Sequence, residues 1–329
     1  MKKFINQVEL VEDQMIQGMV KAYPQYVRKL DCGNVVVRTE KKEGKVALIS
    51  GGGSGHEPAH GGYVGTGMLD AAVAGAVFTS PTPDQIYEGI KAIATDKGVL
   101  MVIKNYTGDV MNFEMAGEMA QMDDIKVAQV VVNDDVAVDG SLYTVGRRGV
   151  AGTVFVHKIA GAKAEEGAEL EEVQRVAQKV IDNVRTMGVA IRPCTVPAAG
   201  KPGFELGEDE MEVGIGIHGE PGTHKEPLRP ADEIVDHILD KILADIDYTG
   251  REVAVMVNSS GATPLMELFI INNHVADVLA EKGIKVYKTF VGEYMTSLEM
   301  EGFSVSLLRL DDELKALLDA HADTIAFKA

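Results

Sequence analysis

Short runs of β-branched and apolar residues alternate along the chain with longer segments in which apolar residues recur at helical spacing. This alternation is typical of α/β proteins, in which helices cover the faces of sheets. In the first half of the chain we predict strands at residues 34–38, 46–50, 99–104 and 126–132. The helices predicted there are residues 83–95, 109–122, 149–164 and 170–185.

The same pattern starts again after residue 185. In this half we predict strands at residues 188–192, 212–217, 253–257, 285–291 and 303–308 and helices at residues 231–246, 264–281 and 312–321. We therefore expect an α/β protein with two α/β domains, residues 1–185 and 186–329, built from mixed sheets flanked by helices. A boundary near Thr186 would place a cleft between the domains, where ligand pockets often form.

The composition is that of an acidic globular protein. Of the 329 residues, 46% are hydrophobic, and 50 Asp and Glu outnumber 32 Lys and Arg to give a formal net charge of −18. This charge argues against binding to nucleic acid or to an acidic membrane. We find no signal-peptide pattern and no apolar run of membrane-spanning length. Cys32 and Cys194 show no metal-binding or redox spacing, so we expect a reducing, cytoplasmic compartment.

Two histidines set among glycines are the strongest candidates for chemistry. His56 lies in Gly-Gly-Gly-Ser-Gly-His-Glu-Pro at residues 51–58, and His218 lies in Gly-Ile-Gly-Ile-His-Gly-Glu-Pro-Gly at residues 214–222. Glycine lets the backbone approach a ligand closely, and imidazole reacts near neutral pH. An apolar strand precedes the first motif and Pro58 suits a first helical turn, so we expect His56 near a strand-to-helix turn.

The first motif matches none of three familiar patterns. The dinucleotide pattern Gly-x-Gly-x-x-Gly fails because its last glycine would be His56 or Pro58. The nucleophile elbow Gly-x-Ser-x-Gly around Ser54 fails because its closing glycine would also be His56. The Gly-Lys pairs that a P-loop would need are followed by Val46 and Pro202. The sequence therefore contains no recognisable nucleotide site.

Residues 56–60 read His-Glu-Pro-Ala-His, which matches the His-Glu-x-x-His motif of zinc metalloproteases. That motif binds zinc on a regular helix, where both histidines share one face. Pro58 lies between His56 and His60, and glycines flank the segment, so a helical pair of ligands is disfavoured. A zinc metalloprotease is therefore a distant alternative, and we expect no metal site in this chain.

Another polar segment, Lys-Asn-Tyr-Thr-Gly-Asp at residues 104–109, joins a predicted strand to a predicted helix. Open α/β sheets bind ligands at the carboxyl ends of their strands, so Lys104 and Asp109 could grip a polyol. Asp109 is equally well suited to cap the helix. Arg147 and Arg148 precede a further helix and could grip an oxyanion or a phosphate, although arginines there are more often salt-bridged surface residues.

These motifs together resemble those of the dihydroxyacetone kinase family. Two of them are longer than the segments described so far, since Val-Met-Asn-Phe follows Asp109 and the arginine pair lies within Gly-Arg-Arg-Gly-Val-Ala-Gly-Thr-Val. The segments that carry the resemblance are residues 51–58, 104–113, 146–154, 214–222, 262–268 and 296–303. The resemblance therefore covers essentially the whole chain.

The resemblance implies a role for each candidate residue. His218 would bind dihydroxyacetone covalently as a hemiaminal, while His56 and Asp109 would act as its acid/base partners. Gly53 and Lys104 would form hydrogen bonds with the substrate hydroxyls. The chemistry is reasonable in itself, because a neutral imidazole nitrogen can attack a ketone, whereas glycerol offers no electrophilic carbon.

Single-chain ATP-dependent members of the family continue into a nucleotide-binding domain, whereas this chain ends at Ala329. The resemblance thus implies the substrate-binding K subunit of the phosphotransferase-system-dependent bacterial form, which holds no cofactor of its own. A separate L subunit would hold ADP or ATP with Mg²⁺, and an M subunit bearing a phosphohistidine would recharge that ADP. We also expect a homodimer. Residues 258–261, Asn-Ser-Ser-Gly, depart from the family pattern and put local packing in doubt.

A non-catalytic sensor of dihydroxyacetone that contacts a transcription regulator is the main alternative. It would keep His218 for capture but would not need to activate a phosphoryl acceptor, so the presence of His56 and Asp109 favours the kinase subunit. We interpret the remaining histidines as structural or surface residues; they are His60, His157, His224, His237, His274 and His321.

Overall fold

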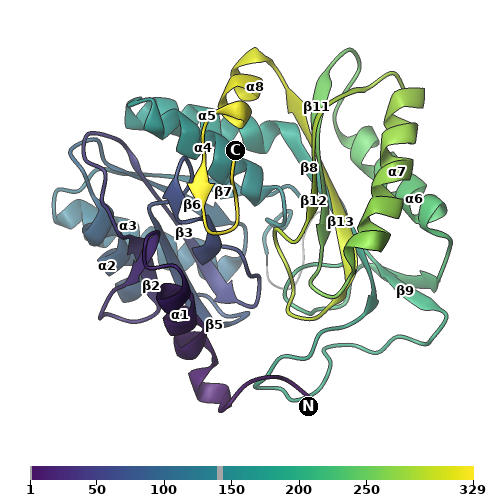
Figure 1. Cartoon of the computed structure of the whole chain (residues 1–329), viewed down its shortest axis with the longest axis horizontal. Helices are drawn as coiled ribbons and strands as arrows, with labels where there is room; N and C mark the ends of the chain where they lie inside the picture. The colour runs from purple at the N-terminus through teal and green to yellow at the C-terminus, as the bar shows by residue number, and fades with distance from the viewer. Residues whose placement is uncertain (1, 139–143) are drawn as a thin grey trace.

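Two six-stranded sheets with helices on their faces make up the computed structural model, which describes residues 2–138 and 144–329 (Figure 1). The first sheet has the order β1-β2-β5-β3-β6-β7 and the second β10-β9-β8-β13-β11-β12. The first sheet comprises β1 (Val27–Lys29), β2 (Val35–Arg38), β3 (Ala47–Ser54), β5 (Ala71–Val77), β6 (Val99–Lys104) and β7 (Val127–Val132). The second sheet comprises β8 (Val184–Arg192), β9 (Glu210–Val213), β10 (His224–Pro227), β11 (Glu252–Ser259), β12 (Lys285–Gly292) and β13 (Glu301–Leu310).

Both sheets are mixed. Strands β5, β3, β6 and β7 pair in parallel, while β1 and β2 add antiparallel strands at one edge. In the second sheet only β11 and β12 pair in parallel. A small third sheet joins β4 (Gly65–Thr66) to β14 (Asp323–Thr324). The predicted fold class, α/β with mixed sheets flanked by helices, is confirmed.

The helices form layers outside and between the sheets (Figure 1). They are α1 (Val11–Ala22), α2 (Pro83–Ile93), α3 (Thr107–Met122), α4 (Thr153–Glu165), α5 (Leu170–Asn183), α6 (Ala231–Asp245), α7 (Leu265–Glu281) and α8 (Asp312–Asp319). Helices α2 and α3 cover the outer face of the first sheet, and α6 and α7 cover the outer face of the second. Helices α4 and α5 share one core with strands of both sheets, which joins the two halves of the chain.

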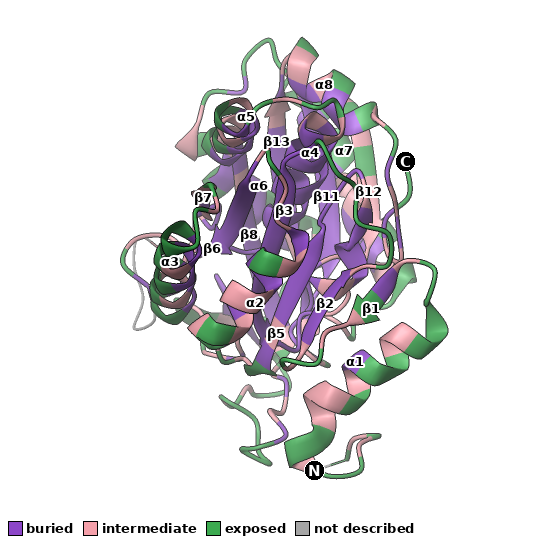
Figure 2. Ribbon diagram, turned by 90° about the vertical axis from the view of Figure 1, so that its left-hand side faces the viewer, coloured by how far each residue is buried: buried purple, intermediate pink, exposed green. Residues whose placement is uncertain are grey.

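Local sequence explains these positions. Strand β6 is buried on both faces, so its sequence is a continuous apolar run in which Leu100 packs toward α4 and α5 and Met101 packs toward α2 and α3. Helix α2 instead buries one stripe, Ile86, Ile90 and Ile93, at helical spacing. Figure 2 shows the strands buried and the exposed residues gathered on the outer helices and loops.

Most predicted strands and helices are present within a few residues, but several elements were missed. Strands β1, β5 and β10 and helix α1 had no counterpart in the prediction. The predicted helix 170–185 ends at Asn183, where β8 begins, and the predicted strand 212–217 ends at Val213 because residue 214 turns away with a positive φ of 69°. The turn that follows carries His218.

The expected strand-to-helix turn at His56 is wrong. His56 lies in an irregular turn after β3, followed only by the short 3-10 helix Gly61–Tyr63. The backbone of this turn pairs with the second half of the chain instead. The amide of Thr296 donates to the carbonyl of His56 at 3.2 Å, and that of Leu298 donates to the carbonyl of Gly55 at 2.7 Å. These carbonyls therefore serve the contact between the halves rather than a helix.

The C-terminal residues return to the first half. Helix α8 packs against α4, and β14 pairs with β4. The predicted division between residues 185 and 186 falls within β8 and stays a prediction. Within residues 2–138 and 144–329, no helix is both long enough and apolar enough to cross a membrane.

The close packing of α4 against the 65–68 turn can be tested at Gly161. A Cβ at Gly161 would lie 2.5 Å from the carbonyl oxygen of Gly67 and 2.5 Å from Cα of Met68. We expect Gly161→Ala to destabilise the protein by about 1–3 kcal/mol because backbone must move. The control Gly18→Ala, at a helical glycine with no atom within 4 Å of its Cβ, should stabilise it by about 0.5–1 kcal/mol. Urea unfolding measures both, and equal effects would contradict the packing argument.

Candidate active site

The candidate site lies between the two halves of the chain, at the carboxyl ends of β3 and β6. Gly53 is near the end of β3, Lys104 ends β6, and Asp109 is in the first turn of α3. His218 approaches from the opposite side on the turn between β9 and β10. Carboxyl ends of parallel strands are the usual binding edge of an open α/β sheet.

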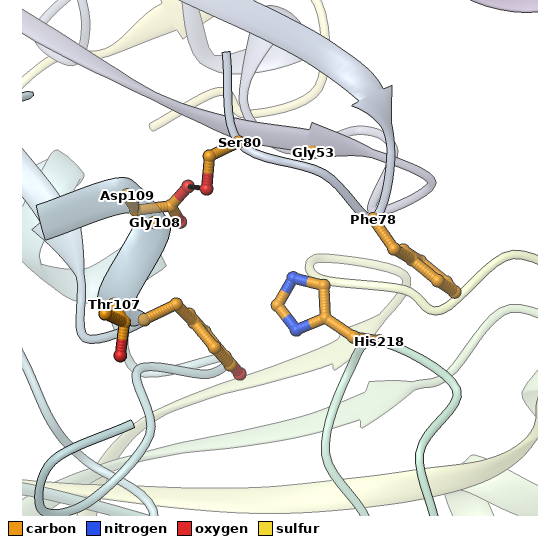
Figure 3. Close-up of a pocket in the computed structure, with 8 residues that line it drawn as sticks. Gly53, Phe78, Ser80, Thr107, Gly108, Asp109 and His218 are labelled. Carbon is orange, nitrogen blue, oxygen red and sulfur yellow. Dashed lines mark hydrogen bonds between the residues drawn. The ribbon is translucent and has the colours of Figure 1, made fainter. Parts of the chain in front are cut away.

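Gly53, Asp109 and His218 are among the residues that surround a cavity of about 370 Å³ (Figure 3). In Figure 3 the imidazole of His218 projects into the space between Phe78 and Asp109, while the side chain of Ser80 points toward Asp109. The residues lining the cavity are Gly53, Phe78, Ser80, Tyr106, Thr107, Gly108, Asp109 and His218. The cavity therefore combines a partly exposed imidazole with a carboxylate on the opposite wall.

His56 and His218 form a hydrogen-bonded pair of imidazoles. Their Nε2 atoms are 3.2 Å apart, and Nδ1 of His56 lies 2.9 Å from the backbone carbonyl oxygen of Thr296. Because a carbonyl oxygen only accepts hydrogen bonds, neutral His56 carries its proton on Nδ1. Nε2 of His56 is then the acceptor between the rings, and Nε2 of His218 is the donor.

Aromatic rings enclose the pair. Phe78 stacks on His56 at a centroid distance of 5.3 Å, and Tyr106 contacts His218 edge-on at 4.2 Å. Burial lowers the pKa of both imidazoles well below the ordinary histidine value, and the positive charge of Lys104 lowers both further. Both rings are therefore neutral near pH 7, which is the form of imidazole that acts as a nucleophile or base.

Lys104 and Asp109 form a buried, charged pair beside the imidazoles. Nζ of Lys104 is 4.0 Å from Oδ2 of Asp109, and Oδ1 of Asp109 accepts a hydrogen bond from Ser80. Burial raises the pKa of Asp109, against the opposing effects of Lys104 and Ser80, and burial lowers the pKa of Lys104. Gly52 makes room for the pair, since a Cβ there would lie 2.9 Å from Nζ of Lys104 and 3.2 Å from Oδ2 of Asp109.

The structure brings all five predicted site residues together. Gly53, Asp109 and His218 line the cavity, whereas His56 and Lys104 lie behind its wall with exposed fractions of 0%. Their individual roles stay predictions. Sequence reasoning missed Phe78 and Ser80, which follow the unpredicted strand β5, and it assigned no role to Tyr106 although that residue lies within the quoted 104–109 motif.

The two histidines of the His-Glu-x-x-His match diverge. His56 contacts His218, whereas Nδ1 of His60 is 3.0 Å from Nε2 of His157. Burial lowers the pKa of His157 to about 3. Across residues 2–138 and 144–329, no three His, Cys, Asp or Glu side chains are grouped so that they could hold a metal ion. The arrangement gives no support to the metalloprotease alternative.

Neither arginine of the 146–154 motif lines the cavity, and both form ion pairs. Arg147 pairs with Asp245 at the end of α6, and Arg148 pairs with Asp135 in a fully buried position. Both arginines are therefore salt-bridged as interpreted, but the surface position is wrong for Arg148, whose side chain is 2% exposed.

The model of the Dak1 domain matches residues 17–326 of this chain. The chain is also 56% identical over 329 residues to the "PTS-dependent dihydroxyacetone kinase 1, dihydroxyacetone-binding subunit DhaK" of Listeria innocua, which covers 99% of this chain and 100% of that protein. With a match of this extent, the chain belongs to the dihydroxyacetone kinase family, as its motifs predicted.

Solved structures of similar fold also belong with dihydroxyacetone kinases by name. The "dihydroxyacetone kinase operon co-activator Dha-DhaQ" superposes with a TM-score of 0.89 at 37% identity, over 95% of this chain and 97% of that chain. The native dihydroxyacetone kinase of C. freundii superposes with a TM-score of 0.93 at 36% identity, over 99% of this chain but 60% of that chain. The family's shared fold thus includes both a kinase and a co-activator by name.

The neutral state of the buried histidines can be tested by nuclear magnetic resonance. At about pH 5.5, where an ordinary histidine with a pKa near 6.5 is mostly protonated, we expect His56 and His218 to keep the nitrogen shifts of neutral imidazole. Their lowered pKa values mean that protonation occurs only at a lower pH. His157 in the same spectrum is an internal reference for a buried neutral ring. An imidazolium signature for His56 or His218 above about pH 6 would show that the site is more hydrated than this geometry implies.

Proposed function

We propose that this chain captures dihydroxyacetone as a hemiaminal on His218 and presents a substrate hydroxyl for phosphorylation by ATP. The observation that carries the proposal is the orientation of His218, which projects into the cavity opposite Asp109 while its Nε2 lies 3.2 Å from Nε2 of His56 (Figure 3). A nucleophile beside a neutral base is the arrangement that covalent catalysis requires. The name of the Listeria innocua relative supports the choice of substrate.

The proton positions make a balanced capture step possible. Nε2 of His56 removes the proton from Nε2 of His218, and the electron pair freed on that nitrogen attacks the ketone carbon and forms the N–C bond. The π electrons of the carbonyl group move to its oxygen, and His56 returns the proton to that oxygen. The product is a neutral hemiaminal, and no proton is gained or lost overall. The Thr296 carbonyl keeps the other proton of His56 on Nδ1 throughout.

Asp109 acts in the following phosphoryl transfer. It removes the proton from a terminal hydroxyl, whose oxygen attacks the γ-phosphoryl group as ADP leaves. Burial raises the pKa of Asp109, which makes this carboxylate a stronger base than an exposed one. Lys104 and the backbone at Gly53 form hydrogen bonds with the substrate hydroxyls and fix its orientation, which removes much of the entropic barrier.

In this proposal the nucleotide is supplied by other chains. An L subunit holds ADP or ATP with Mg²⁺, and an M subunit transfers phosphate to that ADP, as the "PTS-dependent" name of the relative suggests. The C. freundii kinase has a structure with AMP-PNP and Mg²⁺, and this chain covers 61% of it.

We propose a homodimer as the assembled state. The outer face of α7 carries large exposed apolar side chains, and Leu228 lies at the edge of the same face. The exposed residues of α7 are Leu265, Met266, Phe269 and Ile270. An apolar patch of this kind is typical of protein interfaces, and a second copy of the chain would cover it symmetrically.

A sensor is the second candidate function, and the co-activator structure favours it specifically. A sensor would share the capture step and lack the transfer step. The two functions therefore differ at Asp109 and in the product, not in binding.

Reconstitution separates these candidates. We expect the chain mixed with dihydroxyacetone, L subunit, M subunit and a phosphoenolpyruvate-driven phosphocarrier to yield dihydroxyacetone phosphate, detected by a coupled dehydrogenase. The chain alone with ATP should yield none, because its sequence has no phosphate-binding loop. Adduct formation without product in the complete mixture would favour the sensor, and product from the isolated chain would refute the split between subunits.

Two substitutions should separate capture from transfer. His218→Ala should abolish the adduct, because the bond needs the imidazole, and turnover should fall with it. Asp109→Asn should keep the adduct but lower kcat by about 100-fold or more, the usual contribution of a general base. Electron density from crystals grown with dihydroxyacetone locates the adduct, and steady-state assays give kcat. Density joining the ligand to another residue would overturn the mechanism.

A further inference from the structure

Arg148 joins the first half of the chain to both ends of the turn that carries His218. Its side chain is 2% exposed. Its Nε donates to Oδ2 of Asp135 at 2.7 Å, its Nη2 donates to the carbonyl oxygen of Gly214 at 2.7 Å, and its Nη1 lies 3.4 Å from Oε1 of Glu220. Asp135 belongs to the first half, whereas Gly214 and Glu220 lie on either side of His218 in the second. One buried guanidinium therefore bridges three separate points.

The contacts continue to the backbone of His218. Oε2 of Glu220 accepts a hydrogen bond from the amide of His218 at 3.0 Å, while Oε1 of the same carboxylate faces Nη1 of Arg148. Glu220 therefore connects the backbone of His218 to the guanidinium group. Gly216 lies directly beneath them. A Cβ there would be 2.7 Å from Nη1 of Arg148 and 2.0 Å from Oε1 of Glu220. Only glycine at this position lets the arginine and the carboxylate meet across the turn.

We propose that Arg148 is a positioning residue, which acts through Glu220 and Gly214 to hold His218 at the distance from His56 that capture of a ketone requires. This inference rests on the proposed function and extends it to a residue that does not line the cavity. The turn is rich in glycine, so its own backbone has little conformational preference and depends on outside contacts. Arginine suits this task because its rigid, planar group donates in several directions from one place.

The adjacent arginine provides a contrast. Arg147 pairs with Asp245 of α6 and so also links the two halves, but Asp245 belongs to that helix and not to the turn that carries His218. A general loss of packing between the halves would affect both arginines. Loss of positioning at His218 should follow from Arg148 alone, which makes Arg147 a matched control.

The test compares Arg148→Lys and Glu220→Ala with Arg147→Lys. Lysine keeps the positive charge but cannot reach all three partners, and Glu220→Ala leaves the bonds from Arg148 to Asp135 and Gly214 in place, so the fold has support in both variants. The adduct is measured with dihydroxyacetone labelled with ¹³C at its carbonyl carbon, whose resonance moves from the ketone to the hemiaminal region. Steady-state KM and kcat are measured in the reconstituted three-subunit system, and thermal unfolding is followed for every variant.

We expect Arg148→Lys and Glu220→Ala to reduce the adduct equilibrium and raise KM by about tenfold or more, since small displacements of a reacting group have large effects. At saturating substrate, where the adduct has formed, kcat of both variants should stay within about threefold of that of the unmodified protein, because the transfer step uses Asp109. Arg147→Lys should leave KM and the adduct unchanged. A lower kcat at unchanged KM would indicate fewer folded molecules and would overturn the positioning role of Arg148. An unchanged amount of adduct in both variants would overturn that role as well. Absence of an adduct in the unmodified protein would instead refute the proposed function itself.

Discussion

The hydrogen bond between Nδ1 of His56 and the carbonyl of Thr296 is the contact on which the rest of the site depends. It crosses between the halves of the chain and fixes the tautomer of His56, so Nε2 of His56 accepts the hydrogen bond from Nε2 of His218. The backbone bonds between the same two segments hold the donor and acceptor in register. Asn258 supports the second segment, since its side-chain oxygen accepts from the amides of Tyr294 and Met295. The contact between these segments thereby determines which imidazole donates the hydrogen bond between the rings and which accepts it.

Burial of charge near these rings follows from the same packing. Lys104 is completely buried and has Asp109 as its nearest opposite charge in the described residues, at 4.0 Å. Such a pair costs desolvation energy that a distance of this length recovers only in part. The benefit is electrostatic, because the cationic Lys104 disfavours an imidazolium at His56 and at His218. Burial is the main reason that both histidines are neutral near pH 7, and the charge of Lys104 adds to its effect.

Much of this arrangement could be predicted from the sequence, for reasons that differ between elements. Strand β6 and helix α2 have patterns that burial alone explains, so both were found with nearly correct bounds. Strand β5, Ala-Ala-Val-Ala-Gly-Ala-Val, has small residues without alternation, so it was missed and with it Phe78 and Ser80. The turn at His56 was mistaken for the start of a helix because its backbone partners lie about 240 residues away. Motifs predicted the residues of the candidate site, but only tertiary contacts reveal which of them touch.

Selectivity for a ketone over a polyol follows from the proposed use of His218 rather than from the shape of the cavity. A cavity of about 370 Å³ is larger than a three-carbon sugar needs, so exclusion by size cannot distinguish dihydroxyacetone from glycerol. Noncovalent contacts reject a close analogue by about 1–3 kcal/mol when the difference between the two is small and apolar. A bond that only a carbonyl carbon can form imposes a chemical requirement instead. In the proposed mechanism, selectivity therefore depends on the placement of two imidazoles, one a hydrogen-bond donor and the other an acceptor, rather than on a tight enclosure.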